Sequence, residues 1–560
     1  MTSTDKKIPK AELVMAPLGG VGEIGMNCMM YGYGLPGDYS WIMVDLGLTF
    51  AGPREPGVEV IVPDISFAEN EGKNLKAIIL THAHEDHYGA MPDLWESLEV
   101  PVYTTPFTAA MLRAKLSREG LEDIVPIREV GTGKKYDIGP FEIEFINMAH
   151  SIPEPMALHI KTDVGSLFHT GDWKLDPDPI AGPPTDEARI RALGQEGIDV
   201  LVCDSTNATR DGSSISEVDV AKTLKEIVAS SDRRVFVTTF ASNVARIKSI
   251  AEAAYEAGRY VVLAGRALER VVNIAKETGY IPEDYSFLSD QDYQHLPAKE
   301  CLVLATGSQG EGRAAMARIA EGSHPKIKPT RDDTIIFSSR TIPGNEKSVG
   351  YIVNLLAAQG LNIITEAEAP VHVTGHPRRG ELGELYSWVK PDILIPVHGE
   401  ERHLRCQQEF AKSQQISKTL IVRNGSMATL LPNGPKIIDE IPSGRLYRDG
   451  DFILEDDSPI RARRQISNLG TVTVSLVVDN KGTMIGDPIW TELGLPNDPE
   501  SHELEDVIES AVHSVFKSTP PKHRREMGKL QEALRRSVRA AIRDYWGKKP
   551  IVTIHIHQQK

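Results

Sequence analysis

The sequence LKAIILTHAHEDH, residues 75–87, joins an apolar run to a cluster of metal-binding side chains. Residues 75–80 predict a buried strand, and His82, His84, Asp86 and His87 follow it directly. Neutral imidazole and ionised carboxylate suit Zn²⁺ and similar cations. Four such donors exceed what one ion binds while it leaves room for a substrate. The stretch therefore predicts two ions on a loop at a strand end, against the alternative of a solvated polar loop.

The composition sets outer limits on the fold and the function. A chain of 560 residues predicts two to four domains. With 41% hydrophobic and 25% charged residues and no apolar run that matches a membrane span, we expect a soluble globular protein. Residues 1–10 show no secretory signal, which predicts the cytoplasm and no membrane partner. The net charge of −16 argues against nucleic acid, but bound divalent cations would reverse that sign locally.

The four cysteines are far apart in the sequence and have no C-x-x-C spacing. This pattern predicts neither a disulfide scaffold nor a zinc ribbon. We expect each to be a small buried side chain in a reducing compartment. They are Cys28, Cys203, Cys301 and Cys406.

Further histidines and aspartates follow strand-like segments elsewhere in the chain. One such residue is usually a turn residue and would carry no weight alone. Together they predict that strand after strand delivers a metal ligand to one edge of a sheet. These residues are Asp45, His150, Asp172 and His398.

A glycine-rich segment offers a competing interpretation. GVGEIG, residues 20–25, matches the dinucleotide-binding pattern G-x-G-x-x-G, and Asp45 lies 20 residues beyond the last glycine. That fingerprint requires a helix at the glycines, whereas residues 26–33 predict another strand. We therefore interpret these glycines as a turn between strands.

Nine motifs, in order from residue 44 to residue 400, resemble those of the β-CASP group of metallo-β-lactamase-fold hydrolases, most closely the bacterial ribonuclease J family. They are VD (44–45), HAHEDH (82–87), HSIP (150–153), TGDWK (170–174), DSTN (204–207), TFASN (239–243), TGSQGE (306–311), TGH (374–376) and PVHGE (396–400). One departure is Glu154-Pro155, where the group often has Asp-Ser; it touches no predicted ligand.

The resemblance implies an α/β fold with three parts. These are a metallo-β-lactamase αββα sandwich, an inserted β-CASP α/β domain and a small α+β C-terminal domain. In the inserted part, alternating helical and strand patterns also predict a parallel sheet with helices on its faces. The expected boundaries are 1–207 and 370–447 for the two parts of the sandwich, 208–369 for the β-CASP domain, 448–465 for a linker and 466–560 for the C-terminal domain.

The resemblance also implies two Zn²⁺ ions per subunit, with Mn²⁺ or Mg²⁺ as substitutes in assays. Two ions that share a hydroxide suit phosphodiester hydrolysis. The implied ligands are His82, His84 and His150 for one ion, Asp86, His87 and His398 for the other, and Asp172 between them.

Three further residues have implied catalytic roles. Asp45 is expected to orient a ligand histidine. His376, with Asp204 as its carboxylate partner, is expected beside the scissile phosphate as a general acid or oxyanion-stabilising group. His376 could instead be an ordinary loop histidine, but the neighbouring Arg378 and Arg379 favour a phosphate site.

The implied activity is 5′→3′ exonuclease cleavage of single-stranded RNA, preferably 5′-monophosphorylated, together with internal cleavage, in rRNA processing and mRNA decay. The 5′-phosphate pocket is expected in the inserted domain, where glycine and serine expose N–H and hydroxyl donors. Ser242 and Asn243 could equally be helix N-caps. The candidate pocket residues are Gly307, Ser308, Gln309, Ser338, Ser339, Arg340, Ser242, Asn243 and His376.

The resemblance implies a homodimer or tetramer built by the C-terminal domain, and association with RNA-decay proteins. Residues 516–549 hold 11 Lys/Arg against 3 Asp/Glu, which suits an RNA-facing or partner-facing surface, or a solvated helix face. Two alternative functions differ in class. A small-molecule metallo-hydrolase such as a lactonase or thioesterase needs no inserted domain, and a catalytically silent RNA-binding subunit should lack some of the seven ligands.

Overall fold

The computed structural model describes residues 10–496 and 503–559. Its contacts divide the chain into two compact units. Unit 1 comprises residues 1–49 and 61–445, and unit 2 comprises residues 50–60 and 446–560. The expectation about a secretory signal concerns residues that lie almost wholly outside the described part. Within that part, no helix combines the length and the apolar character that crossing a membrane requires.

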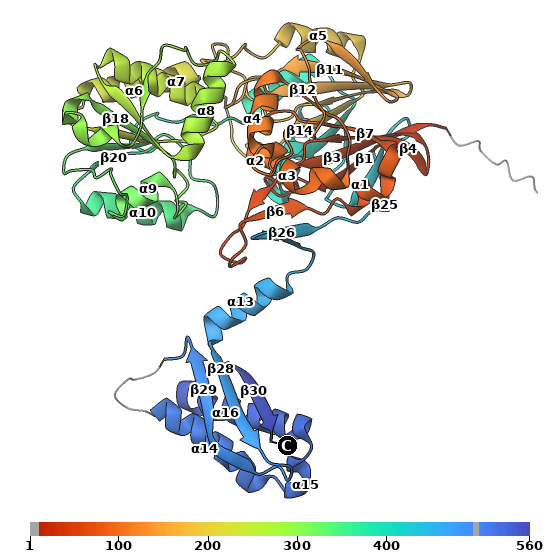
Figure 1. Ribbon diagram of the computed structural model, residues 1–560. Coiled ribbons are helices and arrows are strands. Elements are labelled where there is room, and N and C mark those ends of the chain that lie inside the picture. Colours follow the sequence, from red (N-terminus) through yellow and green to blue (C-terminus); the bar gives the residue numbers. More distant parts are fainter. Residues whose placement is uncertain (1–9, 497–502, 560) are drawn as a thin grey trace, which may run out of the picture. The chain divides into compact units, whose positions relative to one another are not determined.

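Two sheets of unit 1 pack face to face (Figure 1). The first has the order β25 (Lys436–Glu440), β24 (Ser426–Leu431), β1 (Glu12–Gly19), β3 (Cys28–Leu35), β4 (Asp38–Val44), β7 (Leu75–Ile79), β8 (Val102–Thr104) and β9 (Ile127–Glu129). The second has the order β10 (Lys135–Ile138), β11 (Phe141–Asn147), β12 (Met156–Thr162), β13 (Gly165–His169), β14 (Val200–Asp204), β21 (Ile393–Val397) and β23 (Lys418–Thr419). Tyr31 and Ile42 of the first sheet share one buried cluster with Phe145 and Val200 of the second.

Helices cover the outer faces of both sheets. Phe67 packs edge-on against Trp41 of β4, with ring centroids 5.3 Å apart. On the opposite side, Leu193 and Leu385 share a buried cluster with Leu201 of β14. These layers confirm the predicted αββα sandwich. The helices are α1 (Ser66–Glu71), α2 (Glu85–Tyr88), α3 (Met91–Leu94), α4 (Pro106–Leu116), α5 (Glu187–Glu196), α11 (Arg379–Val389) and α12 (Glu401–Ser413).

The inserted part of unit 1 is an α/β structure with its own core. Its six-stranded sheet has the order β17 (Phe287–Leu288), β16 (Tyr260–Ala264), β18 (Cys301–Ala305), β15 (Val235–Thr238), β19 (Thr334–Phe337) and β20 (Asn362–Ile364). Every neighbouring pair is parallel, as predicted. Figure 1 shows one group of helices on one face and a second group on the other. The groups are α6 (Glu217–Ser230), α7 (Val244–Glu256) and α8 (Arg266–Glu277), and α9 (Ala315–Ala320) and α10 (Glu346–Ala358).

Short elements connect these layers. The GVGEIG segment contains β2 (Val21–Gly22) and leads into the strand β3, which confirms the interpretation as a turn between strands. β2 pairs with β22 (Gly399–Glu400), directly after His398. The remaining short elements are β5 (Thr49–Phe50), β6 (Val60–Pro63) and the 3₁₀ turns Gly72–Asn74, Trp95–Ser97, Asp292–His295 and Ala298–Glu300.

Unit 2 has a three-stranded sheet with helices on one face. β28 (Thr471–Val478) lies between β29 (Met484–Leu493) and β30 (Ile551–Gln558). Alternate residues of β28, including Val472 and Val474, pack against Ile508 and Leu534 of the helices. The sequence patterns at 471–478 and 551–557 predict strands, and those at 504–516 and 529–546 predict helices. All four are confirmed, whereas β29 was not predicted. The helices are α13 (Ser458–Leu469), α14 (Glu503–Ser518), α15 (Pro521–Arg524) and α16 (Met527–Trp546), and β26 (Arg445–Asp449) pairs with β27 (Phe452–Leu454).

The segment expected as a linker, residues 448–465, contains β27 and most of α13. Ile460 of α13 is buried, and Arg463 forms an ion pair with Asp449. Regular structure therefore continues through the segment that was expected to be a linker.

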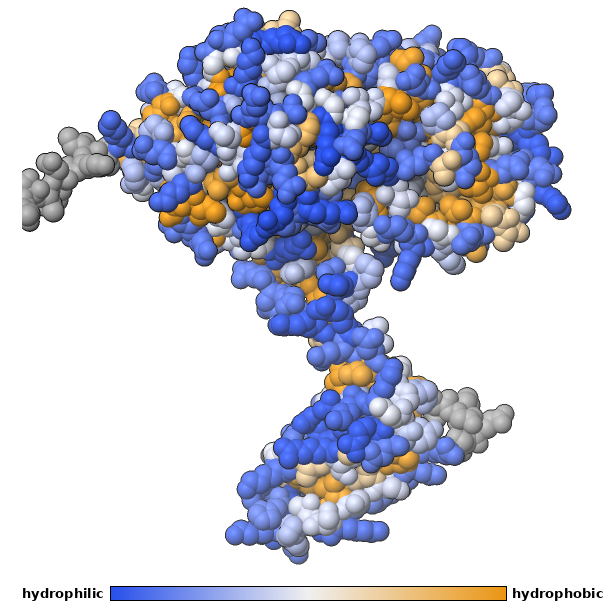
Figure 2. Space-filling model, turned by 180° about the vertical axis from the view of Figure 1, so that it is seen from behind, coloured by the Kyte–Doolittle hydropathy of each residue, from blue (hydrophilic) through white to orange (hydrophobic). Residues whose placement is uncertain are grey.

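Both units have mainly hydrophilic surfaces with small apolar patches (Figure 2). In unit 2, Ile489 is 74% exposed and Leu493 is 66% exposed. Their partners in β28 are Ser475 and Thr471, which alternate with the buried residues of that strand. The two side chains therefore lie on the sheet face opposite the helices.

Three cysteines are buried as predicted, but Cys406 is only half-buried. Its Sγ lies 2.8 Å from Nη2 of Arg379, so the prediction of a small apolar core residue is wrong at this position. The side chain lies on α12, where it faces an arginine rather than the core.

Candidate metal centre

The candidate metal centre lies where strands of both sheets end at one edge. β4 and β7 are parallel neighbours in the first sheet, and β13, β14 and β21 are parallel neighbours in the second. Asp45, Asp172, Asp204 and His398 stand at or just beyond the carboxyl ends of these strands. Asp45 and His398 have positive φ angles of 64° and 50°. Such left-handed backbone is uncommon outside glycine and is found at functional positions.

One group of donors contains three histidines and a shared aspartate: His82, His84, His150 and Asp172. Nδ1 of His84 lies 3.0 Å from Nε2 of His82 and 3.1 Å from Nε2 of His150. Ligands of a tetrahedral Zn²⁺, each about 2.0–2.1 Å from the ion, are about 3.4 Å apart, so this spacing fits one cation. Burial lowers the pKa of His84 to about 4 and holds the pKa values of His82 and His150 well below their usual range. Neutral imidazoles keep the lone pair that a metal binds.

A second group contains Asp86, His87, Asp172 and His398. Nε2 of His87 lies 3.3 Å from Oδ2 of Asp172, and Nε2 of His398 lies 3.4 Å from Oδ2 of Asp86. In the described part of the chain, this buried His398 nitrogen has no hydrogen-bond partner. An orphaned imidazole nitrogen that faces the Asp86 carboxylate fits a metal ligand.

Asp45 belongs to neither donor group but is hydrogen-bonded to His87 of the second group. Its Oδ2 lies 2.7 Å from Nδ1 of His87, and its Oδ1 accepts hydrogen bonds from the backbone and hydroxyl of Thr81 at 2.8 and 3.0 Å. This geometry holds the His87 ring with Nε2 toward Asp172. Asn27, which the sequence did not single out, lies 3.1 Å from the same Nε2 through Nδ2.

His376 and Asp204 form a close pair beside the two groups. Nδ1 of His376 lies 2.7 Å from Oδ2 of the buried Asp204. Burial alone would lower the pKa of His376, but the carboxylates of Asp204 and Asp172 outweigh it and raise that pKa. Asn207 holds the loop by donating to the backbone oxygen of His376 and to the hydroxyl of Thr374.

Gly375 is a position where a side chain would disturb the centre. Its carbonyl oxygen lies 2.6 Å from Nδ1 of His150. A Cβ on Gly375 would lie 2.5 Å from Cε1 of His150, closer than real contacts allow. The loop therefore approaches this histidine only because residue 375 is glycine.

Several predicted pocket residues are occupied by structural contacts. Ser338 is fully buried, and its hydroxyl binds Arg246 and the carbonyl of Val371 at 2.6 and 2.7 Å. The prediction that this hydroxyl binds the phosphate is therefore corrected, because the hydroxyl is already hydrogen-bonded to two groups of the protein. Asn243 accepts a hydrogen bond from the backbone of Arg246 and is the N-cap of α7, the alternative left open for it.

Two loops of the predicted pocket are joined by Gln309. Its amide nitrogen donates to the backbone oxygen of Arg340 at 2.8 Å, and its amide oxygen accepts from the backbone of Ile342 at 2.8 Å. Gly307 has a φ of +108°, and Ser308 and Ser339 are nearly buried. Ser242 is half-buried one residue before the N-cap.

Three arginines lie close enough to interact electrostatically, and one of them, Arg378, follows His376 by two residues. Burial lowers the pKa of Arg210, and the positive charges of Arg340 and Arg378 lower it further. Nε of Arg340 lies 3.4 Å from Glu366, whereas Nε of Arg378 is buried with no hydrogen-bond partner among the described residues. Arg379 instead pairs with Asp211 and the carbonyl of Ala208. Arg210 was missed in the sequence, where its only signal is its place three residues after DSTN.

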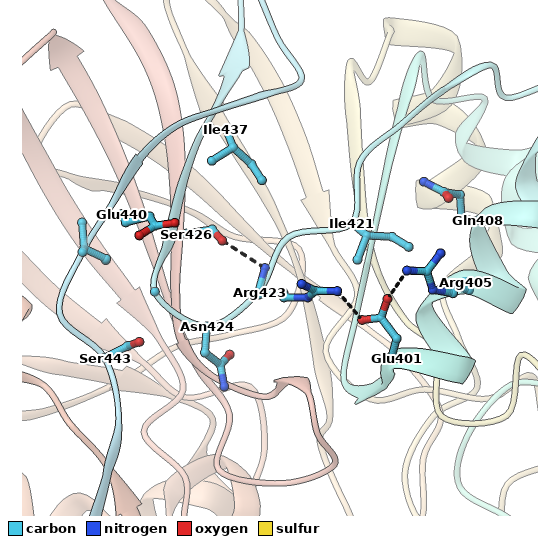
Figure 3. Close-up of a pocket in the computed structure, with 12 residues that line it drawn as sticks. Glu401, Arg405, Gln408, Ile421, Arg423, Asn424, Ser426, Ile437, Glu440 and Ser443 are labelled. Carbon is cyan, nitrogen blue, oxygen red and sulfur yellow. Dashed lines mark hydrogen bonds and ion pairs between the residues drawn. The ribbon is translucent and has the colours of Figure 1, made fainter.

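Two cavities of unit 1 differ in character. One of about 20 Å³ is lined by Asp45, His87, Asp172 and His398, among others, and is large enough for about one water-sized occupant. Another of about 700 Å³ contains none of the predicted ligands. Figure 3 shows that Glu401 of α12 there points toward Arg405 and Arg423, which form ion pairs with it.

Four family models match successive parts of the chain. They are the β-lactamase superfamily domain at residues 40–238, the ribonuclease J β-CASP domain at 232–356, the Zn-dependent metallo-hydrolase RNA specificity domain at 363–419 and the ribonuclease J C-terminal domain at 458–559.

Relatives match along nearly the whole chain. Ribonuclease J of Sinorhizobium meliloti is 50% identical over 97% of this chain and 97% of its own length. The chain belongs to the ribonuclease J family. Ribonuclease J of Mycolicibacterium smegmatis is 35% identical over 96% of both chains, and that of Corynebacterium glutamicum is 34% identical over 98% of this chain and 76% of its own. As a ribonuclease J homologue with a metallo-hydrolase domain, the chain is a metal-dependent ribonuclease.

A solved structure shows the same fold at low identity. A crystal structure of a protein of unknown function from Enterococcus faecalis V583 has a TM-score of 0.53 and 15% identity. The match covers 75% of this chain and the whole of the other chain.

Gly375→Ala should displace His150 and lower metal content. The added methyl group would meet the His150 ring, which must then leave the position beside His84. Metal per chain, measured on purified protein, should fall, while the melting temperature changes by only a few degrees. Gly350→Ala on α10, where a Cβ meets nothing within 4 Å, is the matched control. Full metal content in Gly375→Ala would show that the loop does not fix His150.

Proposed function

We propose that this ribonuclease J family member is a two-zinc enzyme that degrades RNA from 5′-monophosphate ends in the 5′→3′ direction and also cuts internally. The observation that carries the proposal is Asp172, which belongs to both donor groups and lies beside the His376–Asp204 pair. This arrangement suits hydrolysis of a phosphodiester that lies across two cations.

The two donor groups would each hold one ion, with Asp172 as the shared ligand. When bound, the ions supply acidified water and neutralise charge on the phosphate. Asp45 keeps the His87 ring in place through its 2.7 Å contact with Nδ1. Mn²⁺ and Mg²⁺ are the alternative ions for assays.

His376 would act on the leaving group. Its Nδ1 is held by Asp204, which fixes the ring and leaves Nε2 to face the substrate. The side chain is 22% exposed, so a substrate can reach it. A raised pKa keeps a proton on the ring, as a general acid or oxyanion-stabilising group requires.

The arginine cluster supports a site for the 5′-phosphate. Arg340 follows Ser339 directly, and its backbone oxygen accepts a hydrogen bond from Gln309, next to Ser308. One carboxylate, Glu366, partly balances the charge of Arg340. A terminal phosphate would accept charge-assisted hydrogen bonds there, which an RNA with a 5′-hydroxyl forfeits.

The cellular setting is proposed from the family. We place the enzyme in the cytoplasm, in rRNA processing and mRNA decay, together with other RNA-decay proteins. A homodimer or tetramer through unit 2 is supported by Ile489 and Leu493, which are largely exposed on the open face of its sheet.

His84→Ala should remove bound zinc and reduce RNA hydrolysis by several orders of magnitude, because one donor group loses a ligand. The melting temperature should change little, because the residue follows a strand rather than filling the core. Zinc per chain by elemental analysis and hydrolysis of labelled RNA measure the effect. His295→Ala, an exposed histidine outside the site, is the control. Near-normal hydrolysis by His84→Ala with full zinc would contradict the two-zinc proposal.

His376→Ala should lower the cleavage rate by about 10²–10⁴ while zinc content and RNA affinity stay nearly constant. The reason is that the variant loses a proton donor and no metal ligand. Single-turnover kinetics with excess enzyme, alongside zinc analysis, separate the two effects. Loss of zinc would instead make His376 a ligand, in line with its proximity to Asp172 at 3.8 Å.

Arg340→Ala should lower the preference for 5′-monophosphate over 5′-hydroxyl RNA by about 10- to 100-fold, since charge-assisted hydrogen bonds are lost. Initial rates on both RNAs measure that ratio, and a circular RNA reports internal cleavage, which should persist. Arg331→Ala, an exposed arginine in the same domain, is the control. An unchanged ratio would move the pocket away from Arg340.

A further inference from the structure

Four buried charges connect the inserted domain to the sandwich. Lys174 and Asp176 follow β13, Glu217 begins α6, and Arg246 lies in the first turn of α7. Each is at most 2% exposed. Nζ of Lys174 lies 3.0 Å from Asp176 and 3.8 Å from Oε1 of Glu217, and Nη2 of Arg246 donates to Oε2 of Glu217 at 2.8 Å. Two cations and two anions thus form a balanced network.

One end of this network is joined to the candidate metal ligands. The backbone N–H of Lys174 donates to the carbonyl of Ala149 at 2.8 Å. Lys174 therefore stands two residues after Asp172 and next to the residue that precedes His150. Any shift of Lys174 is transmitted through the backbone to both ligands.

The other end is joined to the loop of the proposed 5′-phosphate site. Nη1 of Arg246 donates to the backbone oxygen of Ser338 at 3.1 Å and to its hydroxyl at 2.6 Å. The next two residues are Ser339 and Arg340. The same Nη1 donates to the carbonyl of Val371, in the segment that returns toward His376, at 3.0 Å.

The start of α6 is fixed to the sandwich by the same residues. Asp176 accepts hydrogen bonds from the hydroxyl of Ser216 at 2.7 Å and from the backbone of Glu217 at 3.0 Å. Burial of such charges contributes little to stability, and apolar residues of similar volume often serve as well. Nζ of Lys174 and Oε1 of Glu217 form ion pairs but no hydrogen bond among the described residues, whereas Asp176, Arg246 and Oε2 of Glu217 are hydrogen-bonded. These directional contacts favour one defined arrangement of the parts they join.

We propose that this four-charge network fixes the spacing between the 5′-phosphate loop and the metal ligands, and so sets where the first cut from the 5′ end falls. Glu217 and Arg246 are positioning residues, which touch neither the RNA nor the ions. The proposal rests on the proposed function, because it needs both a 5′-phosphate site and a cleavage site.

Glu217→Gln tests the proposal with little change in size. The substrates are 5′-monophosphate RNA labelled at its 5′ end and a circular RNA. We expect first products of several lengths where the wild-type chain gives one main length, and a loss of about 10- to 100-fold in kcat/KM on the linear RNA. Cleavage of the circular RNA should stay near the wild-type rate, because it needs no 5′ end.

Glu144→Gln is the matched control. Glu144 is 3% exposed and binds Arg189 through both oxygens at 2.7 and 2.8 Å, entirely within the sandwich. The same chemical change there should lower the melting temperature and leave product lengths unchanged. Arg246→Lys is a milder second variant if Glu217→Gln does not fold. It keeps the charge, but one ammonium group cannot reproduce the contacts with Glu217, Ser338 and Val371 together, so product lengths should again spread.

The outcomes separate this proposal from the proposed function. If the wild-type chain shows no dependence on the 5′-phosphate, the proposed function fails first. A second outcome is that the wild-type chain depends on the 5′-phosphate while both variants keep the wild-type product length and the wild-type ratio of linear to circular cleavage. In that case the positioning proposal is wrong. Parallel loss of linear and circular cleavage with a lower melting temperature would assign the network a structural role only and would also overturn it.

Discussion

The structure depends on one buried carboxylate, that of Asp172, which lies among five imidazoles. Its Oδ2 is 3.3 Å from His87 and 3.7 to 3.9 Å from His82, His150 and His376, and its Oδ1 is 2.8 Å from His398. These histidines come from segments more than 300 residues apart in the sequence. They meet because strands of two packed sheets end at one edge, so the sandwich core determines the chemistry at its rim.

The centre also imposes conformations that the chain would not adopt unaided. Left-handed backbone at Asp45 and His398 costs about 1–3 kcal/mol for each residue. At Gly47 a Cβ would lie 1.7 Å from the carbonyl oxygen of Asp86, so only glycine lets the two loops meet. The buried apolar cluster between the sheets supplies the stability that offsets this strain.

Local patterns predicted much of the fold and singled out the residues that the two candidate donor groups contain. The strand predicted at 75–80, observed as β7, and the donors that follow strands can be found from periodicity and from single loops. Contacts between distant segments were not predictable. Glu154 was interpreted as a departure of little consequence, yet it accepts hydrogen bonds from the backbone of Phe107 and the hydroxyl of Tyr280, both at 2.8 Å, and so joins the sandwich to the inserted domain. β29 was missed because Gly486 and Pro488 interrupt its pattern.

Several buried polar contacts join the inserted domain to the sandwich, and each part has its own apolar core. Besides Glu154, the buried Glu381 accepts hydrogen bonds from the backbone of Leu175 in the sandwich and of Ser214 at the start of the inserted segment, at 3.1 and 3.2 Å. Apolar surfaces of suitable volume tolerate repacking, whereas hydrogen bonds lose their value when donor and acceptor shift. These polar contacts thus favour one relative position of the two domains. If the chain acts from a held 5′ end, as we propose, it needs that property, because the distance from that end to the cut must be the same at every step.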